Sequence, residues 1–281
     1  MNRPASRPAE LRVSTRNARF QQWQALLSSR AKRHRAGEFL VHGVRPITLA
    51  ISRGWPIRAM IYAAGRPLSA WAARMLGSVD AVRVAMAPGL VAELAEKDDG
   101  APELIAVAGV PEDRLDRIHV GPGFLGLVLD RMSSPGNIGT LVRSADAFAA
   151  AGVIVAGHAA DVFDPKAVRA STGSIFALPV VRVPSHREVA DWVAALRAGG
   201  VPLRLVGTDE TGPAELGRYD LTGPSLIIVG SEAAGLSAAW RSACDDIVRI
   251  PIGGSASSLN AAAAGTVMLY EAARQRRSQD K

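Results

Sequence analysis

The sequence predicts an α/β protein of two units, of which the C-terminal one is built on a mainly parallel sheet flanked by helices. Short, wholly apolar runs with strand character alternate with runs of helical spacing, which is the pattern of parallel strands covered on both faces. A charged and then Gly/Pro-rich stretch interrupts the alternation at residues 113–123, and we interpret it as a linker. Apolar residues make up 48% of the 281 residues, which is enough for a real core.

The N-terminal unit is predicted to be a smaller α/β domain over residues 17–112. Residues 1–16 before it are polar and carry Pro and Arg, so we expect a flexible basic arm there. Helical spacing predicts helices at 20–27, 44–52, 67–76 and 88–95, the third beginning with a proline in its first turn. Short apolar runs predict strands at 38–41, 57–62, 82–84 and 104–107.

The C-terminal unit, residues 124–281, repeats the alternation with stronger strands. Its predicted strands are 125–129, 153–156, 180–183, 203–206, 226–229 and 247–250. Its predicted helices are 138–149, 165–171, 187–198, 237–244 and 259–274. Ligands of such sheets bind at the carboxyl ends of the strands, so the loops that follow the strands are the expected place for a site.

Three of these loops share an unusual composition. Each joins an apolar strand-like run to a helix-like run through Gly and small polar residues, and they lie at 137–143, 230–236 and 250–260. Gly230 ends its strand and would let a ligand approach the backbone closely. The third loop is the most specific, because a proline and two flexible glycines lead into a Ser-rich stretch and then a helix.

The polar residues of these loops each have a functional and a structural interpretation. Arg143 could act on a ligand or form a surface ion pair with Asp146, and Glu232 could serve a site or be a solvated carboxylate. Ser258 could cap the following helix or help to wrap a small polar ligand. Asn260 could use both functions of its amide, since helix propensity alone explains an Asn poorly at the start of an Ala-rich helix.

Several other kinds of site are excluded or disfavoured. Residues 121–126 spell GxGxxG, but these glycines precede a strand instead of following one, which disfavours a dinucleotide-dependent oxidoreductase. The chain has no GxxxxGK[ST] or HExxH motif and its five histidines are scattered, so we expect no metal. Cys244 is the single cysteine, which excludes a disulfide within the chain. Because we find no signal peptide and no run of about 20 apolar residues, we expect a cytoplasmic protein without a membrane partner.

The charge is large and unevenly distributed. A net charge of +7 and a pI near 10.3 favour an acidic partner, with nucleic acid ahead of an anionic membrane surface. Residues 1–58 carry a net +10, whereas the remaining residues sum to −3. The most compact group of cations is Arg30, Lys32, Arg33 and Arg35, which could contact RNA phosphates or form a solvated helix end.

In this order, the three loops resemble the signature motifs of the SpoU (TrmH-like) RNA 2'-O-ribose methyltransferases of the SPOUT superfamily. The resemblance implies a trefoil-knotted fold, a homodimer, and S-adenosylmethionine (AdoMet) held jointly by the three loops. It assigns cofactor binding to Gly230, Ile250 and Leu259, together with Thr208, Gly235 and Leu236. It assigns the functional polar roles to Asn137, Arg143, Glu232, Ser258 and Asn260.

Residues 14–17 and 37–43 resemble the L30e-like substrate-binding domain attached to many of these enzymes. Stretches at 14–27, 157–164 and 254–262 are similar to members that methylate a uridine ribose of 23S rRNA in antibiotic-producing actinomycetes. This similarity implies that 23S rRNA or the large ribosomal subunit is the partner, with resistance to an antibiotic such as avilamycin as the result. A tRNA 2'-O-methyltransferase and a non-catalytic rRNA-binding protein are the alternatives.

The chemistry that the resemblance implies is transfer of a sulfonium methyl group to a ribose 2'-hydroxyl, which requires no metal. A guanidinium keeps its proton at neutral pH, so we expect Arg143 to hold the phosphate beside the target ribose and to stabilise the forming alkoxide. Glu232 could accept the proton of the hydroxyl or orient Arg143.

Overall fold

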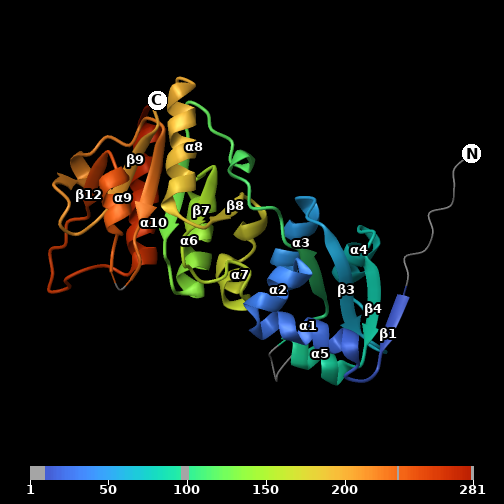
Figure 1. Cartoon of the computed structure of the whole chain (residues 1–281). Coiled ribbons are helices and arrows are strands. Elements are labelled where there is room, and N and C mark those ends of the chain that lie inside the picture. Colours follow the sequence, from blue (N-terminus) through green and yellow to red (C-terminus); the bar gives the residue numbers. More distant parts are fainter. Residues whose placement is uncertain (1–9, 96–100, 233, 280–281) are drawn as a thin grey trace, which may run out of the picture. The chain divides into compact units, whose positions relative to one another are not determined.

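The computed structural model describes residues 10–95, 101–232 and 234–279, and the chain divides into two compact units (Figure 1). One unit comprises Met1–Pro111 with Phe163–Ala177, and the other comprises Glu112–Val162 with Leu178–Lys281. Each unit has its own sheet.

The first unit is built on a five-stranded sheet in the order β1-β4-β3-β5-β2. Its strands are β1 (Glu10–Val13), β2 (Glu38–His42), β3 (Ile57–Ala63), β4 (Val82–Met86) and β5 (Ile105–Gly109). β4 pairs in parallel with β1 and β3, whereas β5 pairs antiparallel with β2 and β3. Its helices are α1 (Ala18–Ser28), α2 (Arg30–Ala36), α3 (Val44–Ser52), α4 (Ala70–Gly77), α5 (Pro88–Ala95) and α7 (Pro165–Ser171). The four strands and four helices predicted for residues 17–112 are all present.

The predicted flexible arm is wrong for residues 10–13, which form the edge strand β1. The side chain of Val13 is buried in the core of this unit, and the backbone of β1 pairs with β4. Burial of an apolar side chain and a paired edge therefore outweigh the polar composition of the stretch. Residues 1–9, the rest of the predicted arm, lie outside the described residues.

Two helices of the first unit differ from the prediction because serine side chains set where they begin. α4 begins at Ala70 and not at Pro67, since the Ser69 hydroxyl accepts a hydrogen bond from the N–H of Ala72 (3.2 Å). The basic stretch after residue 29 forms the helix α2, which was not predicted as a separate element. Ser29 caps its start by accepting from the N–H of Lys32 (3.3 Å).

Within residues 124–281, which are predicted to form one domain, the segment Phe163–Ala177 packs with the first unit. The ring of Phe163 packs on Phe39 with centroids 4.6 Å apart, and the ring of Phe176 packs edge-on against Trp55 at 4.9 Å. Trp55 also donates from its indole N–H to the carbonyl of Phe176 (3.2 Å). Aromatic burial thus assigns the segment to a unit that sequence order does not predict.

The second unit has a seven-stranded sheet in the order β10-β12-β9-β11-β6-β7-β8, and all its strand pairs in the described residues are parallel. The strands are β6 (Leu125–Asp130), β7 (Gly152–Ala156), β8 (Val180–Val183), β9 (Arg204–Thr208), β10 (Ala214–Glu215), β11 (Ser225–Val229) and β12 (Asp246–Arg249). The helices are α6 (Pro135–Ala147), α8 (His186–Ala198), α9 (Ala238–Ala243) and α10 (Ala261–Gln279). The prediction of a mainly parallel sheet is confirmed, and only the two-residue β10 was not foreseen.

Helices cover both faces of this sheet. Ile228 packs with Trp240 of α9 on one face. Val229, the next residue, points to the opposite face, where a Cβ added to Gly265 of α10 would lie 3.1 Å from it. The same added Cβ would lie 2.5 Å from Leu141 of α6, so Gly265 lets α10 approach both the sheet and α6. The trefoil knot stays a prediction.

Candidate active site

A cleft of about 480 Å³ opens at the carboxyl ends of β9, β11 and β12. We call it the strand-end cleft. Residues from the ends of these strands, from the loops after them, from α9 and from the start of α10 line it: Thr208, Asp209, Glu210, Thr211, Val229, Gly230, Ser231, Glu232, Ala234, Gly235, Arg241, Val248, Ile250, Ile252, Ser258, Leu259, Ala261 and Ala264. Two of the three predicted loops therefore meet at one concave site, where sheets of this class bind ligands.

Most of the predicted cofactor residues lie in this cleft. The five that line it are Thr208, Gly230, Gly235, Ile250 and Leu259. Leu236 does not line it, because its side chain is buried in the core, where a Cβ on Gly207 would lie 2.8 Å from it. Leu236 thus anchors the end of the second loop in the core.

Glycine is required at position 230, because the backbone there lies very close to the backbone of Gly235. A Cβ at this position would lie 2.1 Å from the carbonyl carbon of Gly235, a distance that no packing tolerates. The second loop folds back here, and the backbones of Ser231 and Gly235 exchange two hydrogen bonds (3.1 and 2.9 Å). These contacts fix Gly230, Ser231 and Gly235 relative to one another.

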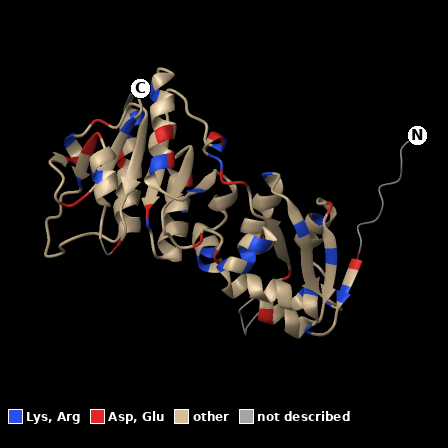
Figure 2. Cartoon of the chain, viewed as in Figure 1, with Lys and Arg blue, Asp and Glu red and all other residues tan. Residues whose placement is uncertain are grey.

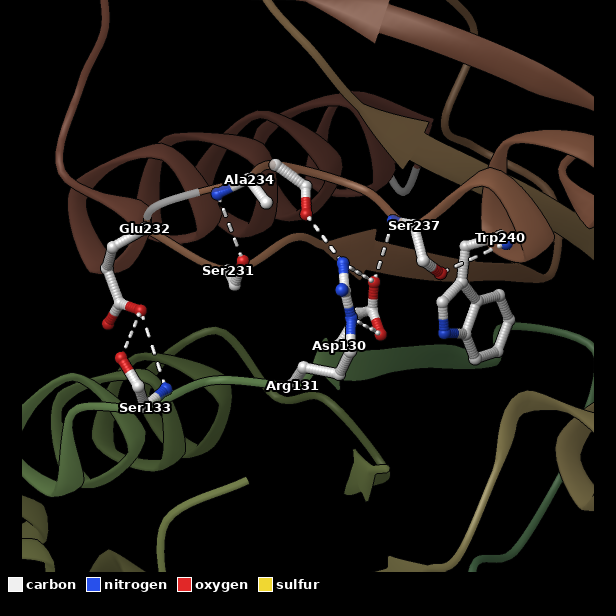
Figure 3. A network of polar contacts seen from close by, with 9 residues as sticks. Asp130, Arg131, Ser133, Ser231, Glu232, Ala234, Ser237 and Trp240 are labelled. Carbon is white, nitrogen blue, oxygen red and sulfur yellow. Dashed lines mark hydrogen bonds and ion pairs between the residues drawn. The ribbon is translucent and has the colours of Figure 1, made fainter. Parts of the chain in front are cut away.

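Glu232 joins the second loop to the first. Its carboxylate accepts hydrogen bonds from the hydroxyl and N–H of Ser133 (3.2 and 3.4 Å) (Figure 3). It also accepts one from the Asn137 amide (2.6 Å). Burial raises the pKa of Glu232, but the hydrogen bonds from Asn137 and Ser133 outweigh it and hold this pKa below its ordinary value. At neutral pH the carboxylate is ionised and weakly basic, which favours an orienting role over proton acceptance.

The side chain of Asn137 is not needed to cap α6, because Ser134 already does so. The Ser134 hydroxyl caps α6 by accepting from the N–H of Asn137 (3.3 Å), and Pro135 occupies the first turn. The side chain of Asn137 is therefore available for contact with another loop. Asn137 does not line the strand-end cleft and is connected to it through Glu232.

In the third loop, Asn260 and not Ser258 caps the helix. The Asn260 carbonyl oxygen accepts from the N–H of Ala262 (2.9 Å) and of Ala263 (3.3 Å) at the start of α10. This capping supplies the structural reason for Asn260 that helix propensity does not. The exposed Ser258 lines the strand-end cleft, whereas the amide nitrogen of Asn260 makes no hydrogen bond with the described residues.

Arg143 is exposed on α6 and lies outside the strand-end cleft. No ion pair of its guanidinium is found within the described ranges, which favours a functional role over the alternative of a surface pair with Asp146. The next residue, Ser144, hydrogen bonds to Thr266 of α10 (2.7 Å) and fixes this part of α6 against the helix that follows the third loop. Arg143 is thus a cation on a rigid support with its donors free.

Two carboxylates of the cleft were not predicted, Asp209 and Glu210. Burial raises the pKa of Asp209, but hydrogen bonds from Thr211 and the charge of Arg241 outweigh it and lower this pKa. Their position directly after the strand predicted at 203–206 is a signal that could have identified them.

Other catalytic chemistries find no support in the described part of the chain. No group of three or more His, Cys, Asp or Glu side chains there could hold a metal ion. Burial raises the pKa of the Cys244 thiol to about 12, so Cys244 is not a thiolate nucleophile at neutral pH. No described helix combines the length and the apolar character that crossing a membrane requires.

The predicted RNA-binding cluster lies on α2, a helix rich in Lys and Arg (Figure 2). Three of its four members, Arg30, Lys32 and Arg35, are exposed. Arg33 needs a correction, because its side chain is only 2% exposed. It donates to the carbonyls of Leu26 (2.6 Å) and Leu27 (3.3 Å) and pairs with Asp164 at 3.4 Å. Arg33 therefore holds α1, α2 and α7 together and has no guanidinium face left for a phosphate.

Comparison with known proteins places these observations in a family. Residues 17–106 match the model of the SpoU L30e-like domain, and residues 125–270 match that of the SpoU rRNA methylase family. The chain is 60% identical over 269 residues to a 23S rRNA (uridine(2479)-2'-O)-methyltransferase of Streptomyces viridochromogenes, covering 96% of this chain and 94% of that relative.

Solved structures agree with this match. The SpoU methyltransferase AviRb from Streptomyces viridochromogenes, in complex with the cofactor AdoMet, is similar with a TM-score of 0.90 and 60% identity, over 94% of this chain and 99% of that one. An AdoMet-bound rRNA methyltransferase from Sinorhizobium meliloti is similar with a TM-score of 0.83 and 28% identity, over 94% of this chain and 98% of that one. The chain therefore belongs to the SpoU rRNA methylase family, as the three loops predict.

Proposed function

We propose that this chain is an AdoMet-dependent RNA 2'-O-methyltransferase whose target is a uridine ribose of 23S rRNA. The observation that carries the proposal is the strand-end cleft, where the second and third loops meet and Glu232 ties them to Asn137 of the first. The named 23S rRNA uridine methyltransferase with 60% identity supports the same target.

The residues of the strand-end cleft suit AdoMet. Its volume of about 480 Å³ lies in the range of small-molecule sites. The apolar side chains of Val229, Ile250 and Leu259 would pack on a nucleoside, and the close backbone approach at Gly230 leaves main-chain groups facing the cleft. The carboxylates Asp209, Glu210 and Glu232 make the cleft acidic, which favours a cationic ligand. When bound, AdoMet supplies an electrophilic methyl group on a positively charged sulfur.

Each polar residue then has a role that follows from its contacts. Glu232, ionised and held by Ser133, orients the Asn137 amide at the mouth of the cleft. Arg143 has no hydrogen-bond or ion-pair partner among the described residues, and its guanidinium binds the phosphate next to the target ribose. There it also stabilises the ribose oxygen as negative charge develops on it. Asn260 caps α10 through its oxygen and offers its amide nitrogen to the ligand or the ribose, and Ser258 shapes the adjoining loop.

The RNA contact is assigned to the exposed face of α2. Arg30, Lys32 and Arg35 are exposed there, in the part of the sequence that carries the net positive charge. Replacing Lys32 or Arg35 by alanine should lower the slope of log affinity against log salt by about 1 each. Arg66→Ala, an exposed arginine after β3, is the matched control and should leave the slope unchanged.

A homodimer and a cytoplasmic location belong to the same proposal. On α10 the side chains of Val267 and Tyr270 are 38% and 49% exposed, and Leu259 of the third loop is 40% exposed. Large apolar side chains left in water favour burial against another surface, and a second copy of the chain supplies one. Resistance to a ribosome-targeting antibiotic such as avilamycin is the proposed consequence of the methylation.

Transfer of a labelled methyl group from AdoMet to purified 23S rRNA, 16S rRNA, tRNA and large ribosomal subunits tests the proposal. We expect label in 23S rRNA, within a dinucleotide that resists alkali because 2'-O-methylation removes the hydroxyl that attacks the phosphodiester. Label in tRNA alone would favour the tRNA alternative. No transfer to any RNA by a folded protein would leave the non-catalytic RNA-binding alternative.

A further inference from the structure

Arg131 has a backbone conformation that favours glycine. Among the described residues, three that are not glycine have a left-handed φ: Arg131 (52°), Ala149 (57°) and Thr172 (49°). An L-residue is strained in this region, and such strain persists where the surrounding structure requires it. Arg131 lies directly after β6, at the start of the connection to the first loop, so the chain tolerates strain next to the site.

The guanidinium of Arg131 connects the end of β6 to the second loop (Figure 3). It donates from Nε to Asp130 Oδ1 (3.1 Å), and from Nη2 to Asp130 Oδ2 (3.3 Å) and to the Gly235 carbonyl (3.4 Å). Asp130 is 3% exposed, and its Oδ2 also accepts from the N–H of Ser237 (2.9 Å). The pair therefore holds the second loop at Gly235 and the start of α9 at Ser237.

The stem of Arg131 is packed as well. A Cβ added to Gly157 would lie 3.1 Å from Arg131 Cγ, and Gly157 itself has a left-handed φ of 73°. The N–H of Arg131 donates to the carbonyl of Ala156 (3.0 Å), which extends the pairing of β6 with β7 by one residue. The strained backbone and the close contact at Gly157 together aim the guanidinium at the second loop.

The point that Arg131 holds controls the geometry of the strand-end cleft. Gly235 lines the cleft, and its carbonyl also accepts from the N–H of Ser231 (3.1 Å). Gly230 is in such close contact with Gly235 that a single added carbon would collide. A displacement of Gly235 would therefore move Gly230 and Ser231, and through Ser231 the adjoining Glu232.

We propose that Arg131 is a positioning residue, which fixes the Gly235 carbonyl and thereby keeps the second loop in the form that binds AdoMet. The inference rests on the proposed function. A guanidinium can bind the Asp130 carboxylate and the Gly235 carbonyl at the same time, whereas a lysine ammonium lacks that planar fork.

Calorimetric titration of the full-length protein with AdoMet tests this role. Arg131→Ala and Arg131→Gly should each raise the Kd for AdoMet about tenfold, the effect of losing one charge-assisted hydrogen bond, and Arg131→Lys should fall between them and the wild type. In steady-state assays the KM for AdoMet should rise while the KM for RNA stays unchanged. Arg131→Gly should melt about 2–4 °C above Arg131→Ala, because glycine relieves the strain.

Ala149→Gly is the matched control for strain. Ala149 is exposed after α6 and has a similar φ of 57°. Its replacement should raise the melting temperature and leave the Kd for AdoMet unchanged, which separates relief of strain from loss of the guanidinium.

Several outcomes would overturn the inference. A Kd for AdoMet within twofold of wild type in folded Arg131→Ala and Arg131→Gly proteins would show that Arg131 positions nothing. Loss of RNA affinity alone would make Arg131 an RNA contact. If both variants failed to fold, wild-type affinity in a folded Arg131→Lys protein would have the same force, since lysine cannot reproduce the fork. Wild-type protein that bound no AdoMet would overturn the proposed function as well, so the two failures are distinguishable.

Discussion

The two walls of the strand-end cleft are held in different ways. The wall formed by the second loop, residues 230–236, is tied to the first loop and to the end of β6 by hydrogen bonds from Asn137, Ser133 and Arg131. In the wall formed by the third loop, residues 251–259 make no hydrogen bond to any part of the chain that the structure describes, and Asn260 at the end of the loop bonds to the start of α10.

This difference distinguishes the wall that is ordered in the free chain from the wall that becomes ordered only when a ligand or another protein binds. A wall fixed by its own contacts costs no ordering when a ligand binds, whereas a wall without such contacts must be ordered at that moment. The third loop also carries Leu259, which is 40% exposed. We therefore infer that AdoMet, or a second protomer, completes the third-loop wall, and that the second-loop wall is preformed.

The largest effect is expected at Arg143, which belongs to neither wall. Arg143→Ala should lower the rate of methyl transfer by about 10²- to 10³-fold, the range found when one donor to a developing oxyanion is removed. The Kd for AdoMet should stay unchanged, because Arg143 lies outside the cleft. Single-turnover transfer and calorimetry on the same preparation measure the two quantities. Full activity in this variant would remove Arg143 from the chemistry.

Glu232→Gln weakens the hydrogen bonds that join the second loop to the first loop. Losing the charge of an acceptor that binds Asn137 and Ser133 should lower kcat/KM about tenfold. A double-mutant cycle with Asn137→Ala should show strong coupling, since both substitutions remove the same contact. Glu112→Gln removes the same charge from an exposed site in the second unit and should have no effect. Additive effects of the Glu232 and Asn137 substitutions would contradict a shared role.

Hydrogen exchange compares the two walls directly. On addition of AdoMet, amides in residues 252–259 should exchange about tenfold more slowly, because ordering raises the free energy of local opening. The amides of Ser231 and Gly235 in the second loop should change little, since each already donates a hydrogen bond to the carbonyl of the other. Equal protection of both loops before AdoMet is added would abolish the distinction.

Acid should weaken the contacts between the second loop and the first loop, because it protonates Glu232. Its folded-state pKa lies below the ordinary value of 4.5, so its stabilising contribution is present above the unfolded-state pKa and is lost as the pH falls through the lowered one. The difference in unfolding free energy between wild type and Glu232→Gln should therefore shrink on acidification below about pH 4.5. Denaturant titrations from pH 6 downward measure it, and a difference that is independent of pH would exclude this linkage.

The sequence predicted the loops well and the contacts between them poorly, for a physical reason. Periodicity and Gly-rich composition are local, so they located Gly230 at the end of a strand that the structure contains and Leu259 in a loop that lines the cleft. The bond from Asn137 to Glu232 joins residues 95 positions apart, and no local pattern encodes which partner a side chain meets. Arg33 illustrates the same limit, since only the packing of α1 against α2 distinguishes it from its exposed basic neighbours.

The smallest effects are expected at Asn260, where the third loop meets α10. They distinguish a role in helix capping from a role in catalysis. The Asn260 oxygen caps α10, so Asn260→Ala should lower the unfolding free energy by about 1 kcal/mol and also reduce activity. Asn260→Asp keeps a capping oxygen but loses the amide N–H donors, so it should retain stability and still lose activity, by a few fold. Thermal denaturation and methyl-transfer rates of the two variants measure both effects. If Asn260→Asp kept full activity, the amide nitrogen would have no part in the reaction, and the residue would serve only to begin the helix.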